Sequence, residues 1–595
     1  MEKRWIIPSI ETDPSEIAHL SKVLNIETPL VQLLWSRGIR NEKAAHSFFS
    51  PQITDLHDPF LMKDMDKAVE RLSKAILNNE KILVYGDYDV DGTSAVALLY
   101  SFLSEVIGSD YKKYIEYYIP DRYSEGYGIS EQGINYCKEQ GFNLLISLDC
   151  GIKATEKVDL ANSYGIDVIV CDHHLAGEEL PNAVAILDPK RPDCPYPYKE
   201  LSGCGVGFKL IQGYCKKFEL PDELWLSKMD LVAISIASDI VAITGENRIL
   251  AYNGLIIINR FPRVGVKSII EQSGIKIHYP LKEETIFSRV ISISDIVFYI
   301  GPRINAAGRM KTGRESVRLL ICEDEDKSFD IGKNINEQNE ERRDLDQKAT
   351  QEAMAIVENS CEFQNRKSIV LYNPNWTKGI IGIVASRLVE KFYRPTIVLT
   401  KSSDGLITGS ARSIKGCNIY EGINSCYDLL EHFGGHKYAA GLSLKEENLE
   451  LFISRFEDFI SENLNEESFI PEINVDLELD LSDITPSFVK NLKRFAPFGP
   501  GNMSPIFLST NVVEDGTARL VAEKHIKMKV LYPDKTSQPI DAIAFNQKGH
   551  FDAISQKKWF NILYHIEENT WNNNTVTQLN IKDIKIAEKK DSYNI

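Results

Sequence analysis

The sequence lacks the features of a disulfide-rich, zinc-binding or membrane-spanning protein. Its ten cysteines are scattered without a CxxC pair, which argues against a disulfide framework and a cysteine-ligated zinc module. No stretch approaches the roughly 18–20 uninterrupted apolar residues of a membrane helix. The first residues turn acidic and polar too early for a secretory signal peptide. We therefore expect a cytoplasmic protein with reduced thiols and no membrane association.

The chain also lacks an excess of basic charge, a fixed-period repeat and long low-complexity tracts. Its net charge of −17 argues against a nonspecific nucleic-acid coat protein, because such proteins are normally basic. An enzyme with basic residues concentrated in one groove stays possible, and bound cations could compensate part of the negative charge. At 595 residues the chain is too long for one core, since single domains rarely exceed about 250–300 residues.

The order of apolar runs predicts a multidomain α/β protein. Short continuous apolar runs alternating with amphipathic segments indicate a parallel-sheet domain, and a second α/β unit follows it. Between them, a charged, proline-free stretch with sparse apolar positions predicts a long, exposed connecting helix. Short alternating runs near the end favour a small β-barrel or sandwich. The expected ranges are 1–60 (helical extension), 61–324 (parallel-sheet domain), 325–358 (connecting helix), 359–465 (second α/β domain) and 466–590 (barrel).

Three aspartates lie at the end of the first strand of the parallel sheet. In KILVYGDYDVDG, Asp87, Asp89 and Asp91 alternate along an extended segment, so their side chains can converge. Packing like charges together is costly unless cations bind between them. The alternative is a solvated acidic turn with a helix cap, which would explain one or two of the aspartates. A helix should follow over 93–106, with Thr93 or Ser94 as its N-cap.

Two other strands end in polar residues of the same kinds. The strand 143–148 runs into Asp149, and the strand 167–171 runs into Asp172–His173–His174. Ligands bind outside the carboxyl ends of strands in open α/β sheets, so these side chains should share one rim. Asp239, after an apolar helix-like segment, is a further candidate. Carboxylate and imidazole ligands suit Mg²⁺ or Mn²⁺, whereas Cys150 and Cys171 should point away as core residues.

These motifs resemble a known family over about residues 60–585. GDYDVDG, Asp149 and Asp172–His173–His174 match the motifs of the DHH phosphoesterase superfamily. The later segments are similar to the RecJ family of bacterial single-strand exonucleases: GPRINAAGRM (301–310), GIIGIVASRL (379–388), GSARS (409–413) and FGGHKYAAG (433–441). FAPFGPGNMSPIF (495–507) resembles that family's oligonucleotide-binding (OB) barrel. The chain departs from the family pattern at Thr377–Lys378 and Met503–Ser504.

The resemblance implies a metal-dependent, single-stranded-DNA-specific 5′-to-3′ exonuclease of DNA recombination and repair. It would release 5′ mononucleotides by two-metal hydrolysis. Two divalent cations, Mn²⁺ or Mg²⁺, would be held by Asp87, Asp89, Asp91, Asp149, His173 and Asp239. Asp172 is expected to orient His173 or support the strand end, and Arg303 to bind the phosphoryl oxygens. His174 is expected to contact the scissile phosphate; the alternative is a hydrogen-bonded structural histidine.

Recognition of the 5′ end needs a separate group of residues. By resemblance, Arg122, Ser410 and Arg412 would bind a terminal phosphate, unless the two arginines pair with acids across the domain interface. Arg309, in the same segment as Arg303, could supply a cation to the phosphoryl oxygens of the substrate or brace its loop through backbone carbonyls. His436 lies in a glycine turn that allows close approach of DNA, although a tightly packed turn explains the same residues.

The expected partner is single-stranded DNA, with a single-strand-binding protein and a RecQ-type helicase as protein partners, and the chain could act as a monomer. Three other functions compete with this one. A DHH enzyme of very short oligonucleotides or nucleotides would not need the barrel. A catalytically dead DNA-binding scaffold should have lost several carboxylates. A purely structural protein with acidic loops is the third.

Overall fold

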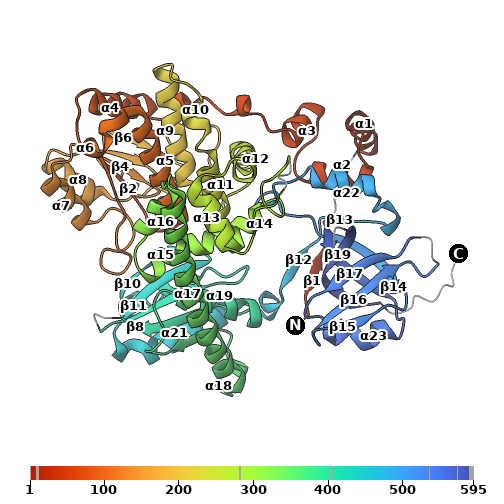
Figure 1. Cartoon of the computed structure of the whole chain (residues 1–595). Helices are drawn as coiled ribbons and strands as arrows, with labels where there is room; N and C mark the ends of the chain where they lie inside the picture. The colour runs from red at the N-terminus through yellow and green to blue at the C-terminus, as the bar shows by residue number, and fades with distance from the viewer. Residues whose placement is uncertain are drawn as a thin grey trace. The chain divides into compact units, whose positions relative to one another are not determined.

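The computed structural model describes residues 2–8, 13–279, 283–402, 405–534, 537–571 and 574–587. The chain folds into two compact units (Figure 1). One unit is the continuous segment Leu56–Ile470. The other combines the two ends of the chain, Met1–Asp55 and Pro471–Ile595. The multidomain α/β architecture expected from the sequence is confirmed.

A five-stranded parallel sheet organises the first part of the Leu56–Ile470 unit. Its order is β3-β2-β4-β5-β6, and every neighbouring pair is parallel. The strands are β2 (Ile82–Gly86), β3 (Ile115–Tyr118), β4 (Leu144–Leu148), β5 (Asp167–Cys171) and β6 (Ala185–Leu187). The chain moves outward in one direction from β2 to β3 and in the other from β4 onward. Such a reversal opens a crevice at the carboxyl ends of β2 and β4, where doubly wound folds bind ligands.

Helices cover both faces of this sheet (Figure 1). Because successive strand residues face opposite sides, Leu83, Leu145 and Val168 share a buried cluster with residues of α7 (Glu131–Gln140) and α8 (Thr155–Ser163). The other face packs against α4 (Met65–Leu77), α5 (Val90–Ile107) and α9 (Gly203–Lys217). The helices that follow are α10 (Glu223–Leu226), α11 (Met229–Ser238), α12 (Gly245–Arg260), α13 (Val264–Gln272), α14 (Ile293–Asp295), α15 (Gly301–Met310) and α16 (Arg314–Leu320), with a π-helix at Ile296–Ile300.

Helix α5 begins earlier than the sequence suggested. Its N-cap is Asp89, and the expectation of Thr93 or Ser94 was wrong because both lie inside the first two turns. The segment Val90–Tyr114 is long and apolar enough to cross a membrane by length and composition. However, 67% of its most apolar window is buried inside the protein, as expected for a core helix packed against α9 and α11.

The connecting helix is confirmed as α17 (Glu325–Asn359), a single helix of 35 residues. The expectation that it is exposed was wrong for one face. That face is buried against α13, α15 and α19 (Ile381–Phe392). Several of its buried side chains are polar, among them Gln338, Asn339 and Asp346, which explains why the sequence shows few apolar positions.

The second α/β region contains a five-stranded sheet of order β10-β11-β9-β8-β7. Its strands are β7 (Ile369–Tyr372), β8 (Thr396–Lys401), β9 (Ile407–Arg412), β10 (Leu430–His436) and β11 (Ala439–Leu444). Only β7 and β8 are parallel. Helix α19 packs on one face, with Ile369 and Val398, and α21 (Leu449–Asn463) packs on the other, with Val370 and Ile397.

The unit formed by the two chain ends is a closed β-barrel with attached helices. The barrel order is β13-β14-β18-β19-β17-β16-β15, and β14 also pairs with β16. Its strands are β13 (Leu477–Glu478), β14 (Phe507–Glu514), β15 (Arg519–Val521), β16 (His525–Leu531), β17 (Ile540–Ala544), β18 (Phe560–Trp571) and β19 (Asn574–Ile586). The N-terminal helices α1 (Pro14–Leu24), α2 (Thr28–Ser36) and α3 (Glu42–Phe49) share its hydrophobic core, and the ring centroids of Phe49 and Phe495 lie 5.4 Å apart.

Candidate metal centre and phosphate site

The loop between β2 and α5 places three carboxylates at the crevice of the parallel sheet. Asp87 follows β2 and is buried, whereas Asp89 caps α5 by accepting a hydrogen bond from the Gly92 amide at 3.0 Å. Asp91 lies in the first turn of the helix. A Cβ atom at Gly92 would lie 2.5 Å from the carbonyl oxygen of Asp87. Glycine at this position therefore lets the helix start directly against the strand end.

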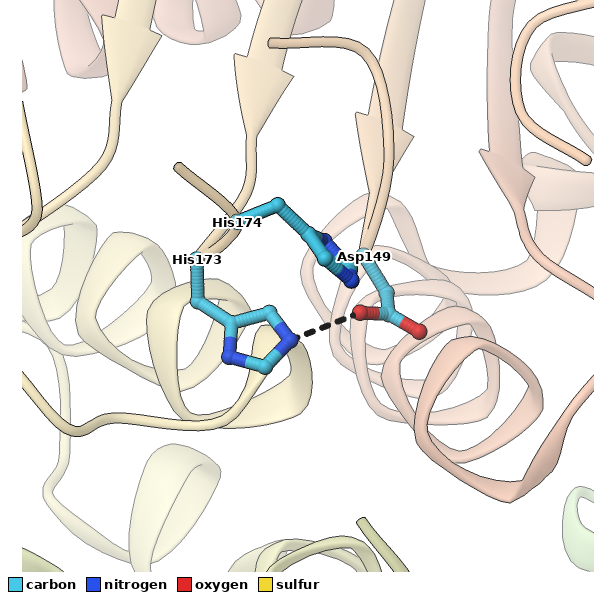
Figure 2. A group of neighbouring side chains, drawn as sticks. All are labelled: Asp149, His173 and His174. Carbon is cyan, nitrogen blue, oxygen red and sulfur yellow. Dashed lines mark ion pairs between the residues drawn. The ribbon is translucent and has the colours of Figure 1, made fainter. Parts of the chain in front are cut away.

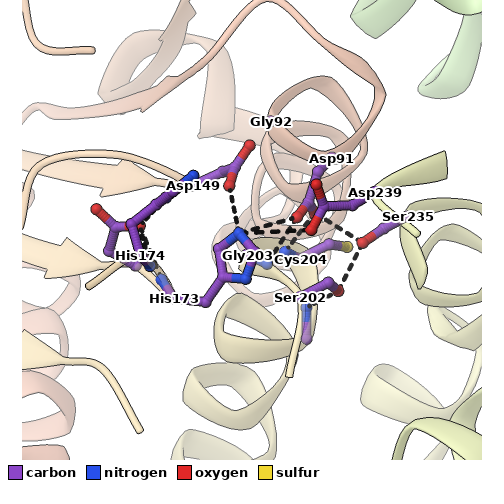
Figure 3. A network of polar contacts seen from close by, with 12 residues as sticks. Asp91, Gly92, Asp149, His173, His174, Ser202, Gly203, Cys204, Ser235 and Asp239 are labelled. Carbon is purple, nitrogen blue, oxygen red and sulfur yellow. Dashed lines mark hydrogen bonds and ion pairs between the residues drawn. The ribbon is translucent and has the colours of Figure 1, made fainter. Parts of the chain in front are cut away.

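Asp91 is held in one orientation by a set of short hydrogen bonds (Figure 3). Its carboxylate accepts from the backbone amides of Gly203 and Cys204 and from the Ser235 hydroxyl, each at 2.7 Å. The two amides belong to the first turn of α9, where unpaired N–H groups and the helix dipole favour an anion. The N-terminus of α9 therefore stabilises the ionised carboxylate of Asp91.

His173 stands among three carboxylates that come from different elements (Figure 3), and Figure 2 shows its ion pair with one of them, Asp149. Its Nε2 lies 3.1 Å from Asp149 Oδ1, 3.6 Å from Asp239 Oδ2 and 3.8 Å from Asp91 Oδ2. Asp149 ends β4 with a φ of 59°, and Asp239 is the C-cap of α11. The three-strand convergence predicted from the sequence therefore exists, and Asp239 joins it.

Asp172 supports His174 and the backbone at the end of β5. Its Oδ1 accepts from His174 Nδ1 at 2.7 Å and from the His173 amide at 2.7 Å, and its Oδ2 accepts from the Ile152 amide at 2.9 Å. The expected support of the strand end is thus present in the structure. The ring that Asp172 orients, however, is that of His174 and not that of His173.

The acidic cluster is electrostatically strained without cations. Burial, reinforced by the neighbouring carboxylates, raises the pKa values of Asp87, Asp89 and Asp149, and it raises the pKa of Asp239 to about 8. Burial lowers the pKa of His173. These directions mean that the site disfavours its own negative charge and keeps His173 neutral, which is the form that ligates metals.

The donor atoms fit divalent cations. Asp87 Oδ1 and both ring nitrogens of His173 are buried and have no hydrogen-bond partner in the part of the chain that the structure describes, an arrangement that is costly unless a ligand satisfies them. Three sets have ligand atoms within 4.8 Å of one another: Asp87, Asp89 and Asp149; Asp91, His173 and Asp239; and Asp149, His173 and His174. Oxygen and imidazole donors of this kind suit Mn²⁺ or Mg²⁺.

A cluster of arginines lies where the parallel-sheet region meets the second sheet. Burial and the charges of Arg122, Arg342 and Arg412 lower the pKa of Arg309 to about 10, and burial with the charge of Arg122 lowers the pKa of Arg412. Arg412 Nη1 donates to the Ser410 hydroxyl at 3.0 Å. Among the described residues, no carboxylate forms a salt bridge with Arg122 or Arg412, so these cations have the character of an anion site.

Of three other predicted site residues, Arg303 has surroundings different from those expected, whereas Arg309 and His436 do not contradict the predictions. Arg303 donates to Asn336 Oδ1 at 2.9 Å and to the Tyr299 carbonyl at 2.7 Å, so its guanidinium faces α17. Within the described ranges it forms no hydrogen bond with the carboxylates of the cluster. Arg309 Nη1 donates to the Gly379 carbonyl at 3.0 Å, as in the bracing alternative. His436 is exposed at the end of β10.

Sequence reasoning missed two residues beside these sites. Arg342 comes from the middle of α17 and adds a cation to the arginine cluster, and its position in a highly charged helix hid it. Tyr127 contacts His174 through its hydroxyl. It lies in the same IPDRYSEGYG segment as Arg122, so proximity in sequence to a predicted phosphate ligand was the available signal.

Comparisons with known proteins agree with this arrangement. Family models match the DHH family N-terminal domain at residues 81–236, the DHHA1 domain at 365–462 and the RecJ OB domain at 475–583. The chain is 38% identical to the single-stranded-DNA-specific exonuclease RecJ of Bacillus subtilis, over 98% of this chain and 71% of that protein. It is 30% identical to the Escherichia coli RecJ, over 93% of this chain and 96% of that protein.

A solved structure shows the same fold. The crystal structure of Thermus thermophilus RecJ in complex with Mn²⁺ matches with a TM-score of 0.81 and 25% identity, over 98% of this chain and 80% of that one. The identities and coverage of the sequence relatives exceed what fold similarity alone would produce. The chain belongs to the RecJ family of single-stranded-DNA-specific exonucleases, within the DHH phosphoesterase superfamily.

Proposed function

We propose that this protein degrades single-stranded DNA from its 5′ end to 5′ mononucleotides, in DNA recombination and repair. The observation that carries the proposal is the buried cluster of carboxylates around His173, whose ring nitrogens have no hydrogen-bond partner among the described residues. This cluster lies on the same unit as a cluster of arginines. The first group fits metal ions and the second fits a phosphate. Family membership supports the choice of DNA as substrate.

The chain's own residues would hold, orient and polarise the reacting groups. Asp87, Asp89, Asp91, Asp149, His173 and Asp239 would hold two divalent cations. Asp149 belongs to two of the three sets of ligand atoms that lie within 4.8 Å of one another. When bound, the cations activate water and stabilise charge on the attacking and leaving oxygens. His174, which Asp172 holds at 2.7 Å, would donate a hydrogen bond to the scissile phosphate. Burial opposes protonation of His174, but the hydrogen bond and charge of Asp172 raise its pKa.

The arginine cluster supports the proposed polarity. Arg122, Arg309 and Arg412, with the Ser410 hydroxyl, would bind a terminal 5′ phosphate, and Arg342 would add to their positive charge. A terminal phosphate bound by these residues would place the phosphodiester bond next to the 5′ end at the carboxylate cluster, so cutting would proceed from the 5′ end. We assign no contact with the substrate to Arg303, because its guanidinium is used by α17 and a neighbouring carbonyl.

The test compares the wild-type protein with Asp89→Asn, which retains an N-cap side chain but loses the charge. Purified proteins receive Mn²⁺ and oligonucleotides that are labelled at the 5′ or 3′ end, single-stranded or duplex. We expect stepwise shortening of single strands from the 5′ end by the wild type only, and none with chelator present. Equal activity on duplex, or a preference for dinucleotides, would contradict the proposal.

A second comparison tests the end-recognition site. Arg412→Gln should reduce the preference of the enzyme for a 5′ phosphate over a 5′ hydroxyl, because it removes one cation of the cluster. The variant should leave Mn²⁺ binding unchanged, since Arg412 belongs to the second sheet. An unchanged preference would rule out the arginine cluster as the site of the terminal phosphate.

The proposal extends to the domain boundaries, the cellular location, the oligomeric state and the protein partners. We infer five segments, with a helical extension at 1–60, a DHH domain at 61–324, a connecting helix at 325–358, a DHHA1 domain at 359–465 and an OB-like domain at 466–590. The protein would act in the cytoplasm as a monomer on single-stranded DNA, with His436 near the strand. A single-strand-binding protein and a RecQ-type helicase are the proposed protein partners. Size measurements and pull-down with each partner test these assignments.

A further inference from the structure

A cavity of about 790 Å³ lies between Tyr127 of the parallel-sheet region and the face of the second sheet. It is lined by aromatic, cationic and hydroxyl side chains, including Tyr127, Lys378, Thr408, His432, Phe433 and Ser443. The Ser443 hydroxyl is buried and has no hydrogen-bond partner among the residues described. An aromatic pair, a cation and an unsatisfied hydroxyl are suited to one nucleotide of a single strand.

Tyr127 connects this cavity with the metal centre. Its hydroxyl donates to the backbone carbonyl of Asp149 at 3.0 Å and lies 3.2 Å from His174 Nδ1 and 3.4 Å from His174 Nε2. The two rings meet edge to face, with centroids 5.8 Å apart. Tyr127 is 55% exposed as a residue, so the hydroxyl is anchored while part of the ring stays accessible.

The Tyr127 hydroxyl has one proton, which it donates to the Asp149 carbonyl, so its oxygen can only accept from the His174 ring. The imidazole of His174 therefore has two neighbours: its Nδ1–H donates to the Asp172 carboxylate at 2.7 Å, and the Tyr127 hydroxyl oxygen lies beside both ring nitrogens. Loss of either contact would free the ring to rotate away from the carboxylate cluster.

We propose that Tyr127 has two separable roles in the proposed exonuclease reaction. Its hydroxyl is a positioning group that keeps His174 facing the scissile phosphate, and its ring is a stacking surface for the base of a nucleotide in the cavity. This inference rests on the proposed function. Tyr127 would then contact both the bound DNA base and His174, so that placement of the strand and orientation of the histidine depend on the same residue.

Two substitutions separate the roles. Tyr127→Phe removes only the hydroxyl, and we expect kcat to fall about tenfold with KM for single-stranded DNA unchanged, the signature of an interaction that acts in the reaction step. Tyr127→Ala also removes the ring, and we expect an additional rise of about tenfold in the dissociation constant. Tyr427→Ala, which changes an exposed tyrosine of the same unit, is the matched control and should change neither quantity.

Binding is measured by fluorescence anisotropy with a 5′-phosphorylated oligonucleotide carrying phosphorothioate linkages, so that this readout is independent of turnover. The titration is then repeated with strands that carry a single abasic site at successive positions. At one position Tyr127→Phe and Tyr127→Ala should bind equally, because the base that stacks on the ring is missing there. Wild-type kcat for Tyr127→Phe would refute the positioning role. Equal affinity of the two variants for every intact strand would refute the stacking role.

The proposed function and this inference fail in different ways. If the wild-type protein does not shorten single-stranded DNA, the proposed function is wrong. If the wild type is active and the two Tyr127 variants are equivalent to it, only the assignment of Tyr127 is wrong. Thermal melting with Mn²⁺ present, which should be the same for all three proteins, identifies any variant whose loss of activity comes from misfolding.

Discussion

Replacing Asp239 with asparagine should make the metal-free protein more stable at alkaline pH. The Asp239 carboxylate lies 3.6 Å from His173 and its side chain is only 28% exposed. Burial and the charges of Asp91 and Asp89 raise its pKa from 3.8 to about 8. The folded protein therefore holds this proton across a pH range in which the unfolded chain has already released it.

The sign and size of the effect follow from proton linkage. Below pH 4 the carboxyl is protonated in both states and contributes nothing. As the pH rises from about 4 to about 8 the unfolded state gains stability by ionising, so the free energy of unfolding falls, and above that range the penalty is constant. One pKa unit corresponds to about 1.4 kcal/mol. Because neighbouring carboxyls share the repulsion, we expect Asp239→Asn to regain about 1–3 kcal/mol at pH 8.

The assay is thermal and urea unfolding with chelator at several pH values between about 5 and 9, because the Asp239 penalty should develop within this range. The control is Asp330→Asn, since Asp330 is exposed on α17. Asp239→Asn should be more stable than wild type near pH 8 and similar to it near pH 5. With excess Mn²⁺ the order should reverse, because the wild type binds the cation more tightly.

Two results would refute this reasoning. If Asp239→Asn were less stable than wild type with chelator at every pH, Asp239 would contribute a stabilising contact and not a repulsive charge. If Mn²⁺ raised the melting temperature of both proteins equally, Asp239 would not be a ligand.

Three further outcomes are expected. Gly92→Ala places a methyl group against the Asp87 backbone; it should lower the free energy of unfolding by about 2–4 kcal/mol and weaken Mn²⁺ binding, as measured by thermal melting and metal titration. Its control is Gly549→Ala, whose methyl group faces open space and should be tolerated. Arg303→Ala should lower stability by about 2–4 kcal/mol yet retain kcat well below its melting temperature; a loss of kcat in the folded variant would restore its catalytic role. Phe49→Ala should destabilise the barrel unit by about 3–5 kcal/mol, seen by calorimetry, without altering Mn²⁺-dependent melting of the other unit.

The parts of the fold with strong local signals could be predicted. β5 occupies the expected range 167–171, and β4 begins one residue later than the expected strand 143–148, because continuous apolar runs buried on both faces have few alternatives. The predicted start of α5 was wrong because Asp89, three residues before Gly92, is the N-cap and accepts a hydrogen bond from the Gly92 amide. Proximity of an aspartate to a glycine does not reveal that contact in a sequence.

Contacts between distant segments could not be predicted in the same way. The helices near residues 14–49 share a core with residues of 479–584, and no periodicity in either segment encodes that partner. The buried face of α17 is polar, so its burial left no apolar stripe. For Arg303, the glycine- and arginine-rich segment resembles a phosphate site, but α17 supplies the hydrogen-bond acceptor Asn336.

The sequence by itself determined which chemistry is available: aspartates at strand ends and paired histidines in the order of the DHH phosphoesterases, followed by the arginine and barrel segments of the RecJ family. Strand ends of a parallel sheet share one edge, so local patterns were enough to bring these carboxylates together. Only the tertiary structure decided how each side chain is used. Asp172 holds His174, Arg303 faces α17, and Tyr127 lines the cavity at the second sheet and also contacts the metal centre. Side-chain orientation depends on partners far away in the chain, and those partners are set by packing.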